Sequence, residues 1–209
     1  MATGRGWGSQ REPMRTPPPI RHHHTNHRRR DPMTHSDIPH GHHPRTRVGA
    51  LLLLTDPQDR LVLVQPRYKE GMILVGGARH GDERPRAAAL RECREEIGFE
   101  VAPGRLLLTY WSPPNPTSGA EAGVNFVYDG GTLSHEQLDS ITLPENNELL
   151  AWDLVEETQL EHFCSRPNKV VIQTALDARR LGRCYDLEFA SPALEGKVLP
   201  NPYNGQAAA

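Results

Sequence analysis

The stretch from Gly77 to Phe99 limits the fold of this 209-residue chain more than any other part. Its middle, residues 85–97, predicts a helix. Pro85 suits the first helical turn, where an amide hydrogen would have no partner and its absence costs nothing. Gly98 suits the position just after the helix, where a residue in the left-handed conformation ends it. We therefore expect a helix whose two ends are both encoded locally.

Three glutamates follow one side of this helix. Glu92, Glu95 and Glu96 stand at i, i+3 and i+4, which places their carboxylates on one face within mutual reach. Carboxylates so close raise one another's pKa unless a positive charge lies among them. A hard divalent cation supplies that charge through oxygen ligands. The pattern predicts a site for Mg²⁺, with Mn²⁺ as the alternative ion. The alternative interpretation is a solvated charged helix face without a functional role.

The neighbouring face of the helix is apolar, at about 100° of rotation per residue. It carries Ala89, Leu90, Cys93 and Ile97. The helix can therefore bury this face and hold the glutamates at the rim. We expect Arg91 to brace Glu92 or Glu95 from the flank of the helix.

The full spacing of this stretch resembles the complete Nudix box of MutT-like proteins. The matching positions are Gly77, Glu83, Arg91, Glu92, Cys93, Glu95, Glu96, Gly98 and Phe99. The likeness extends over about residues 46–185. It implies a Nudix-type α/β/α sandwich with a mixed central sheet, and an enzyme that hydrolyses a nucleoside diphosphate linked to another moiety. Many members carry Pro-Gly-Gly before the box, whereas this chain has Val75-Gly76-Gly77.

The resemblance also implies roles for individual residues. Glu92, Arg91 and Glu83 form the expected catalytic group, in which Glu92 acts as both base and metal ligand. Glu95, Glu96 and the backbone carbonyl of Gly76 are the other expected ligands, because two glycines let the backbone approach a bound ion closely.

A carboxylate outside the box often completes such a site. The candidates are Glu121, Glu145 and Glu148, each of which is otherwise an ordinary surface residue. Arg67, after the second expected strand, is a candidate anion contact or a surface arginine.

Aromatic side chains offer faces on which a nucleobase can stack. Trp111, Tyr110 and Phe126 are the candidates, with core packing as the alternative. The expected substrate-binding set is therefore Arg67, Trp111, Glu121 and Glu148. Pro114 lies fifteen residues beyond Phe99, a distance at which ADP-ribose-cleaving members carry a proline. This favours nucleotide sugars such as ADP-ribose and leaves nucleoside triphosphates open.

Outside the box, the apolar patterns predict an α/β domain over residues 46–187. Strands are expected over 48–54, 61–65, 72–75, 105–111, 123–128 and 149–153, and helices over 155–163 and 168–181. Strands interrupted by helices predict a mixed sheet covered on both faces.

The two ends of the chain have a different composition. Residues 1–45 are rich in Arg, His and Pro and predict disorder, and residues 188–209 predict a frayed tail. Histidine clusters at 22–24 and 40–43 are alternatives for loose metal binding. Residues 1–46 carry eight Arg against three acids, about +5, so the remainder carries about −7 of the total −2. An acidic body argues against a nucleic-acid partner.

Further sequence features concern the location, the partners and the alternative function of the protein. Three scattered cysteines without paired spacing predict a reduced, cytoplasmic location. The longest apolar run, residues 50–54, is far too short to cross a bilayer. The expected partner is a nucleotide-derived small molecule, and a homodimer stays open. The alternative function is a non-catalytic, Nudix-like nucleotide-binding regulator.

Overall fold

The computed structural model describes residues 45–116, 119–145 and 148–189. The chain divides into two units, Met1–His43 and Pro44–Ala209, and all described residues belong to the second. Apart from Arg45, the expected disordered tail lies outside the described residues. The two histidine clusters and residues 190–209 also lie outside them.

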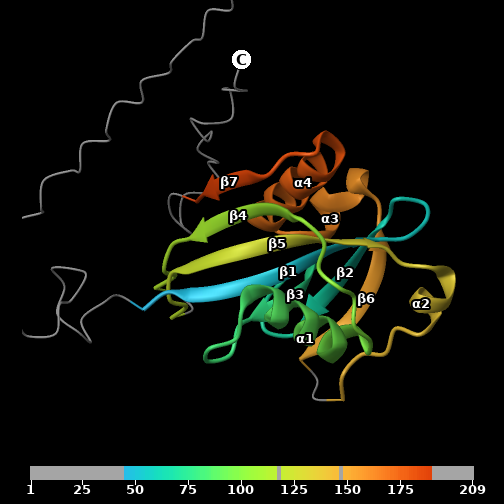
Figure 1. The fold of residues 1–209 in the computed structure, drawn as a ribbon, viewed down its shortest axis with the longest axis horizontal. Helices are drawn as coiled ribbons and strands as arrows, with labels where there is room; N and C mark the ends of the chain where they lie inside the picture. Colours follow the sequence, from blue (N-terminus) through green and yellow to red (C-terminus); the bar gives the residue numbers. More distant parts are fainter. Residues whose placement is uncertain (1–44, 117–118, 146–147, 190–209) are drawn as a thin grey trace, which may run out of the picture. The chain divides into compact units, whose positions relative to one another are not determined.

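The described strands form one mixed sheet of seven strands in the order β6-β2-β3-β1-β5-β4-β7 (Figure 1). Their bounds are β1 (Arg47–Thr55), β2 (Leu61–Pro66), β3 (Ile73–Ala78), β4 (Leu106–Ser112), β5 (Gly123–Thr132), β6 (Leu149–Val155) and β7 (Tyr185–Glu188). β1 runs parallel to β5, and β4 runs parallel to β7, whereas the other pairs are antiparallel. The expected mixed sheet is confirmed.

Two helices cover opposite faces of this sheet, α1 (Pro85–Ile97) on one side and α4 (Arg166–Leu181) on the other (Figure 1). A hydrophobic core lies on each face of the sheet, and β1 contributes side chains to both, because successive side chains of a strand point to opposite faces. Leu53 packs in the core under α4, and Leu52 and Leu54 pack in the core under α1. The α/β/α sandwich is thereby confirmed. None of the described helices is long and apolar enough to cross a membrane.

Three short helical segments complete the described elements. They are α2 (His135–Asp139), η1 (Glu157–Gln159) and α3 (Leu160–Phe163). The sequence analysis missed α2, whose start is fixed by a capping box between Ser134 and Gln137. The expected helix over 155–163 was wrong at its start, because Val155 still pairs with Leu61 as the last residue of β6. α4 begins two residues earlier than expected, with a proline in its first turn.

The expected frayed tail from residue 188 was also wrong at its first two positions. Glu188 ends β7, which pairs with β4, and the Phe189 N–H donates to the Trp111 carbonyl at 3.2 Å. The Phe189 ring is buried and meets Tyr110 edge-on, with ring centroids 6.0 Å apart. A short strand of four residues leaves little periodicity to detect, which explains why the sequence analysis missed it.

This packing predicts a stability effect for Phe189. The substitution Phe189→Ala removes a buried ring and should lower the free energy of unfolding by about 3 kcal/mol, the lower end for Phe→Ala in a core. Urea unfolding of both proteins measures the difference. Leu181→Ala is the matched control, because Leu181 is 59 % exposed and should change stability by no more than about 0.5 kcal/mol. Equal small effects of both substitutions would contradict the packing of Phe189.

Candidate active site

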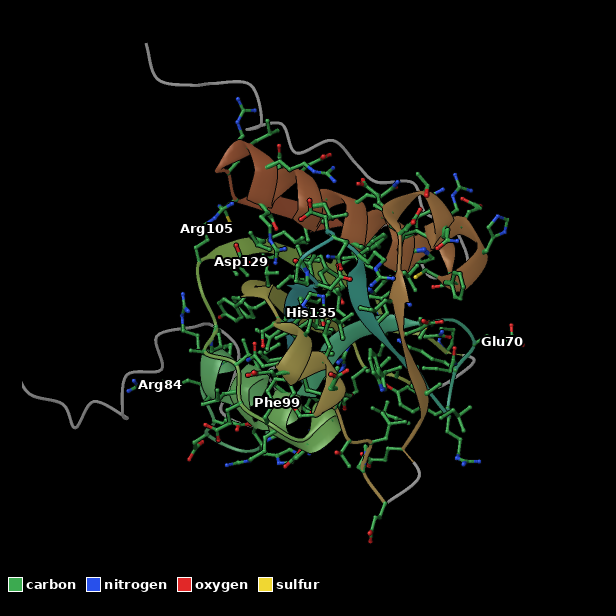
Figure 2. All side chains as sticks on the ribbon, turned by 90° about the vertical axis from the view of Figure 1, so that its right-hand side faces the viewer. Glu70, Arg84, Phe99, Arg105, Asp129 and His135 are labelled. Carbon is green, nitrogen blue, oxygen red and sulfur yellow. The ribbon has the colours of Figure 1, made fainter. Side chains whose placement is uncertain are left out.

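The local sequence sets both ends of α1 as expected. Arg84, before the helix, is extended, and Pro85 occupies the first turn. Gly98 is left-handed with φ 91°, and its N–H donates to the Arg94 carbonyl at 3.1 Å. Figure 2 labels Arg84 and Phe99, which flank the helix at its two ends.

The apolar face of α1 differs from the expected one at a single position. Ala88, Ala89, Cys93 and Ile97 are buried under the sheet, whereas Leu90 is half-buried. Burial of this face fixes the rotation of the helix and therefore the direction in which the glutamates point.

Arg91 is the centre of an ion-pair network along α1. Its Nη1 lies 2.7 Å from Glu95 Oε2 and 2.9 Å from Glu92 Oε1. Its Nε and Nη2 donate to Glu83 at 3.1 Å, and Nη2 also donates to the Ala78 carbonyl at 2.9 Å. The hydrogen bond from Arg91 lowers the pKa of Glu83, and the same pair raises the pKa of Arg91. Arg91 therefore orients three carboxylates against the end of β3.

Glu96 is a carboxylate in poor surroundings for a negative charge. Its pKa is raised to about 8, chiefly by burial and further by the nearby charges of Glu92 and Glu148, against the opposing hydrogen bond from the backbone. That bond runs from the Gly76 N–H to Glu96 Oε2 at 2.6 Å. Burial also raises the pKa of Glu92, which Arg91 opposes. The negative charge on the acidic side of α1 is thus only partly balanced by Arg91.

The glycines at the end of β3 lie against these carboxylates. A Cβ atom on Gly77 would stand 2.6 Å from the Glu92 carboxyl carbon, far below a normal contact. Gly76 has φ 134°, and a Cβ there would stand 2.3 Å from the Ala50 carbonyl oxygen. Gly76 therefore requires glycine, whereas a side chain at Gly77 would displace the end of the Glu92 side chain. The two glycines let bare backbone face Glu92 and Glu96.

The donor set suits a hard divalent cation better than any softer metal, because it consists of carboxylate and backbone oxygens. The buried, undercompensated Glu96 charge is the kind of feature that such a cation would relieve. As the side chains stand, no group of three or more His, Cys, Asp or Glu among the described residues could hold an ion. Glu95 points to Arg91 instead, so the metal roles of Glu92, Glu95, Glu96 and Gly76 stay predictions that require Glu95 to turn.

One candidate from outside the box, Glu148, lies within electrostatic reach of Glu96. Its carbonyl accepts a hydrogen bond from the Arg67 N–H at 2.9 Å. The backbones of Arg67, in the loop after β2, and of Glu148 therefore lie side by side, and the roles of both side chains stay predictions. Glu70, also in this loop, points away from the body of the domain (Figure 2).

The other residues predicted from the sequence make no recorded contact with the box glutamates. Within the described residues, no hydrogen bond or ion pair joins Trp111, Glu121 or Glu145 to the box glutamates. Trp111 is partly exposed on β4. Phe126 is half-buried and stacks on Tyr128 in the core under α1, with centroids 6.4 Å apart. Core packing is therefore the observed role of Phe126.

A small hollow of about 40 Å³ lies on the α4 side of the sheet, two residues before Gly76 along β3. Its lining includes Leu51, Lys69, Leu74, Tyr110, Asn168 and Val171. The charge of Glu96 raises the pKa of both Tyr68 and Lys69. The β2–β3 loop, which contains these two residues, therefore lies near both the hollow and the Glu96 carboxylate. The sequence analysis missed Tyr68, Lys69 and Asn168. The available signal was the position of Tyr68 and Lys69 directly after Arg67.

These observations define an α/β/α sandwich whose glutamate-rich helix faces a glycine turn. The chain belongs to the NUDIX family, because the family model described as the NUDIX domain matches residues 45–173. It is a pyrophosphohydrolase of the Nudix type. Over 124 residues it is 28 % identical to human diphosphoinositol polyphosphate phosphohydrolase 3-alpha, covering 59 % of this chain and 72 % of the relative.

Solved structures show the same fold at low sequence identity. A UDP-X diphosphatase matches with a TM-score of 0.56 and 19 % identity over 69 % of this chain and 68 % of that one. A MutT protein from Methanosarcina mazei Go1 matches at 0.53 and 16 %, over 66 % and 96 %. An ADP-ribose pyrophosphatase from Streptococcus suis 89-1591 matches at 0.50 and 17 %, over 68 % and 99 %.

The contact between Gly77 and Glu92 yields a prediction that separates activity from stability. The substitution Gly77→Ala forces the Glu92 carboxylate to move, so hydrolysis should fall by about 10- to 100-fold if a 1 Å displacement matters as it does in other active sites. The free energy of unfolding should change by less than about 1 kcal/mol, because the displaced group is the end of a flexible side chain. Steady-state kinetics and urea unfolding measure the two quantities.

The matched control for this prediction is Gly81→Asn in the loop before α1. A Cβ at Gly81 meets no atom within 4 Å, and asparagine tolerates its left-handed φ of 42°. This variant should keep its activity within about twofold. Full activity of Gly77→Ala would show that Glu92 does not need its observed position.

Proposed function

We propose that this protein is a Mg²⁺-dependent pyrophosphohydrolase that cleaves a nucleoside diphosphate linked to another moiety. The observation that carries the proposal is the half-buried Glu96 carboxylate, which accepts a hydrogen bond from the Gly76 N–H and has Glu92 and Glu148 as charged neighbours. A site that concentrates negative charge on buried oxygens is suited to a divalent cation and, through it, to a diphosphate.

The ligand set of the proposed site is Glu92, Glu95, Glu96 and the carbonyl of Gly76. When bound, the cation supplies charge neutralisation of phosphate oxygens and lowers the pKa of a bound water. Glu92 lies between Arg91 and Gly77, from where it can accept the proton of the attacking water. Glu148, near Glu96, is the preferred outer carboxylate over Glu121 and Glu145.

Arg91 and Glu83 act as positioning residues in this proposal. Arg91 holds Glu92 at 2.9 Å, and Glu83 holds Arg91 in turn at 3.1 Å. Glu83 also accepts a hydrogen bond from the His80 N–H at 3.0 Å, which ties the network to the loop before α1. Each carboxylate is thereby fixed by a group that is itself fixed.

We favour a nucleotide sugar such as ADP-ribose over nucleoside triphosphates as the substrate. The hollow beside Lys69, at about 40 Å³, is too small for a nucleobase or a sugar, so the preference rests on the distance of Pro114 from Phe99 and on the structural neighbours. The names of two structural neighbours, a UDP-X diphosphatase and an ADP-ribose pyrophosphatase, agree with this substrate class. The complete glutamate set of the box gives no support to the non-catalytic regulator.

A substrate screen tests the proposal. The full chain with Mg²⁺ is offered ADP-ribose, UDP-sugars, nucleoside triphosphates and a diphosphoinositol phosphate, and the products are separated and quantified by ion-exchange chromatography. The control is Glu92→Gln, which should be inactive on the same panel. We expect turnover to be highest on a nucleotide sugar. No turnover on any of these compounds, or equal turnover by Glu92→Gln, would overturn the proposal.

The substitutions Glu95→Gln and Glu96→Gln test the metal ligands. Each removes one negative charge and keeps the shape, so it should cost about 3–4 kcal/mol of transition-state stabilisation, or about 10²–10³ in kcat. Metal-free Glu96→Gln should be at least as stable as the wild type, because it no longer buries a charge. Measurements are kcat against Mg²⁺ concentration and thermal unfolding. Glu100→Gln, an exposed glutamate beyond the box, is the control.

Metal removal gives an independent prediction. Exhaustive chelation should abolish turnover, and added Mg²⁺ or Mn²⁺ should restore it, because the carboxylates alone repel a diphosphate. The measurement is turnover before chelation, after chelation and after titration of each ion. Turnover that survives complete chelation would rule out the proposed ligand role of the box glutamates.

A further inference from the structure

Tyr68, in the loop between β2 and β3, presents its aromatic ring to solvent. At 77 % it is the most exposed of the large hydrophobic side chains among the described residues. Two other tyrosines differ from it, because Tyr128 is buried under α1 and Tyr110 packs edge-on against Phe189. Single exposed hydrophobic side chains are common on protein surfaces, so exposure by itself assigns no role to Tyr68. Its loop and its neighbours distinguish it from an ordinary surface residue.

The loop that carries Tyr68 is held at both ends. At the β2 end, Gln65 Nε2 donates to the carbonyls of Pro66 and Lys69 at 3.0 and 3.1 Å, which closes the turn around Tyr68. At the β3 end, the Met72 N–H donates to the carbonyl of the last residue of α3 at 2.7 Å. A loop anchored in this way loses little conformational freedom when a ligand binds it.

Lys69 lies against one face of the Tyr68 ring. Its Nζ stands 5.9 Å from the ring centroid, within the range in which a cation is attracted to an aromatic face. The Lys69 side chain can cover only one face of the ring. Because most of Tyr68 is exposed, the opposite face is open to solvent. The loop therefore offers a flat aromatic surface that is supported from behind.

Tyr68 lies beside the acidic side of α1. The residue before it donates its backbone N–H to the Glu148 carbonyl at 2.9 Å. Partial burial raises the pKa of the Tyr68 hydroxyl, and the charge of Glu96 raises it further, whereas the charge of Arg47 lowers it. Arg47 is fixed at the start of β1, where its Nη2 donates to Asn125 Oδ1 at 3.3 Å. The ring is therefore a neighbour of the proposed catalytic carboxylates without being one of their hydrogen-bond partners.

The organic part of a substrate held at these carboxylates must lie on the open surface around them. The hollow on the α4 side, at about 40 Å³, is too small to take a nucleobase. An open aromatic face binds any nucleobase by stacking, because every base has a flat π-face. An inositol ring or an inorganic diphosphate has no such face. The exposed ring of Tyr68 can therefore distinguish nucleotides from other diphosphates.

We propose that Tyr68 stacks on the nucleobase of the substrate and thereby selects nucleoside diphosphate derivatives over diphosphates that lack a base. The inference rests on the proposed function, because it names the side chain that recognises the organic part of the same substrate. Tyr68 contributes binding and takes no part in the hydrolysis itself. Lys69 supports the ring from its other face.

The test compares two probes that share a diphosphate analogue and differ only in the nucleoside. They are α,β-methylene-ADP and methylenediphosphonate, whose P–C–P linkages resist hydrolysis. Calorimetry with the full chain and Mg²⁺ gives Kd for α,β-methylene-ADP, and displacement of this probe gives Kd for methylenediphosphonate. Tyr68→Ala should weaken binding of α,β-methylene-ADP by about 5- to 20-fold, the lower part of the range for base stacking. Its affinity for methylenediphosphonate should stay within about twofold of the wild type.

Three more variants separate the ring from other properties of the side chain. Tyr68→Phe keeps the ring and should bind α,β-methylene-ADP at least about threefold more tightly than Tyr68→Ala. Tyr68→Leu keeps an apolar side chain without a ring and should bind nearly as weakly as Tyr68→Ala. The matched control is Leu181→Ala, which removes an apolar side chain that is 59 % exposed and should stay within about twofold of the wild type. Thermal unfolding monitors the fold of each variant.

Turnover gives a second readout. On a nucleotide substrate, Tyr68→Ala should raise KM by about 5- to 20-fold and change kcat much less, because stacking holds the substrate and the transition state equally. On a substrate without a base, such as a diphosphoinositol phosphate, the same variant should leave KM within about twofold.

Each remaining outcome counts against the inference or against the proposed function. Binding of α,β-methylene-ADP by Tyr68→Ala within twofold of the wild type, or no binding by the wild type, would overturn the inference. Equal weakening of both probes would also overturn it, since Tyr68 would then act on the diphosphate or on the loop. A loss in Tyr68→Phe as large as in Tyr68→Ala would assign the contact to the hydroxyl and overturn stacking. If binding depends on the ring but no compound is hydrolysed, stacking stands and the proposed function fails.

Discussion

The burial of the Glu96 carboxylate against the Gly76 amide is the interaction on which the rest of the site depends. The bond is short, at 2.6 Å, and it joins α1 to the end of β3 across 20 residues of sequence. Because burial disfavours the charged form, this carboxylate is stable as an anion only beside additional positive charge. A bound cation there would favour the ionised form of Glu96.

The packing of α1 makes this burial possible. Ala88, Ala89, Cys93 and Ile97 fill the space under the sheet, and their small or compact side chains bring the helix close to β3. Gly76 and Gly77 then remove the last steric obstacle between the backbone and the glutamates. The positive charge of Arg91 balances part of the negative charge on this helix. Its guanidinium, however, pairs with Glu83 and Glu95 and not with Glu96. The packing therefore fixes the shape of the site, and the negative charge of its glutamates is only partly balanced.

The two faces of the sheet contribute differently to the proposed reaction. The α1 face supplies the acidic groups, and the α4 face carries Arg47 on Asn125 and the hollow with Tyr110. The β2–β3 loop, with Tyr68 and Lys69, lies within electrostatic reach of both. On the α4 face, Phe189, directly after β7, packs edge-on against Tyr110.

The sequence by itself determined what is encoded at short range. The bounds of α1 follow from Pro85 and Gly98, and the glutamate face follows from the helical period, so both were predictable from neighbours within a few turns. The mixed sheet followed from strands that alternate with helices. Tertiary structure alone decided the long-range pairings: Arg47 with Asn125, Phe189 with Tyr110, and Glu148 near Glu96. Such contacts depend on strand order and sheet twist, which no local pattern records, and a strand as short as β7 has too few residues to show a period.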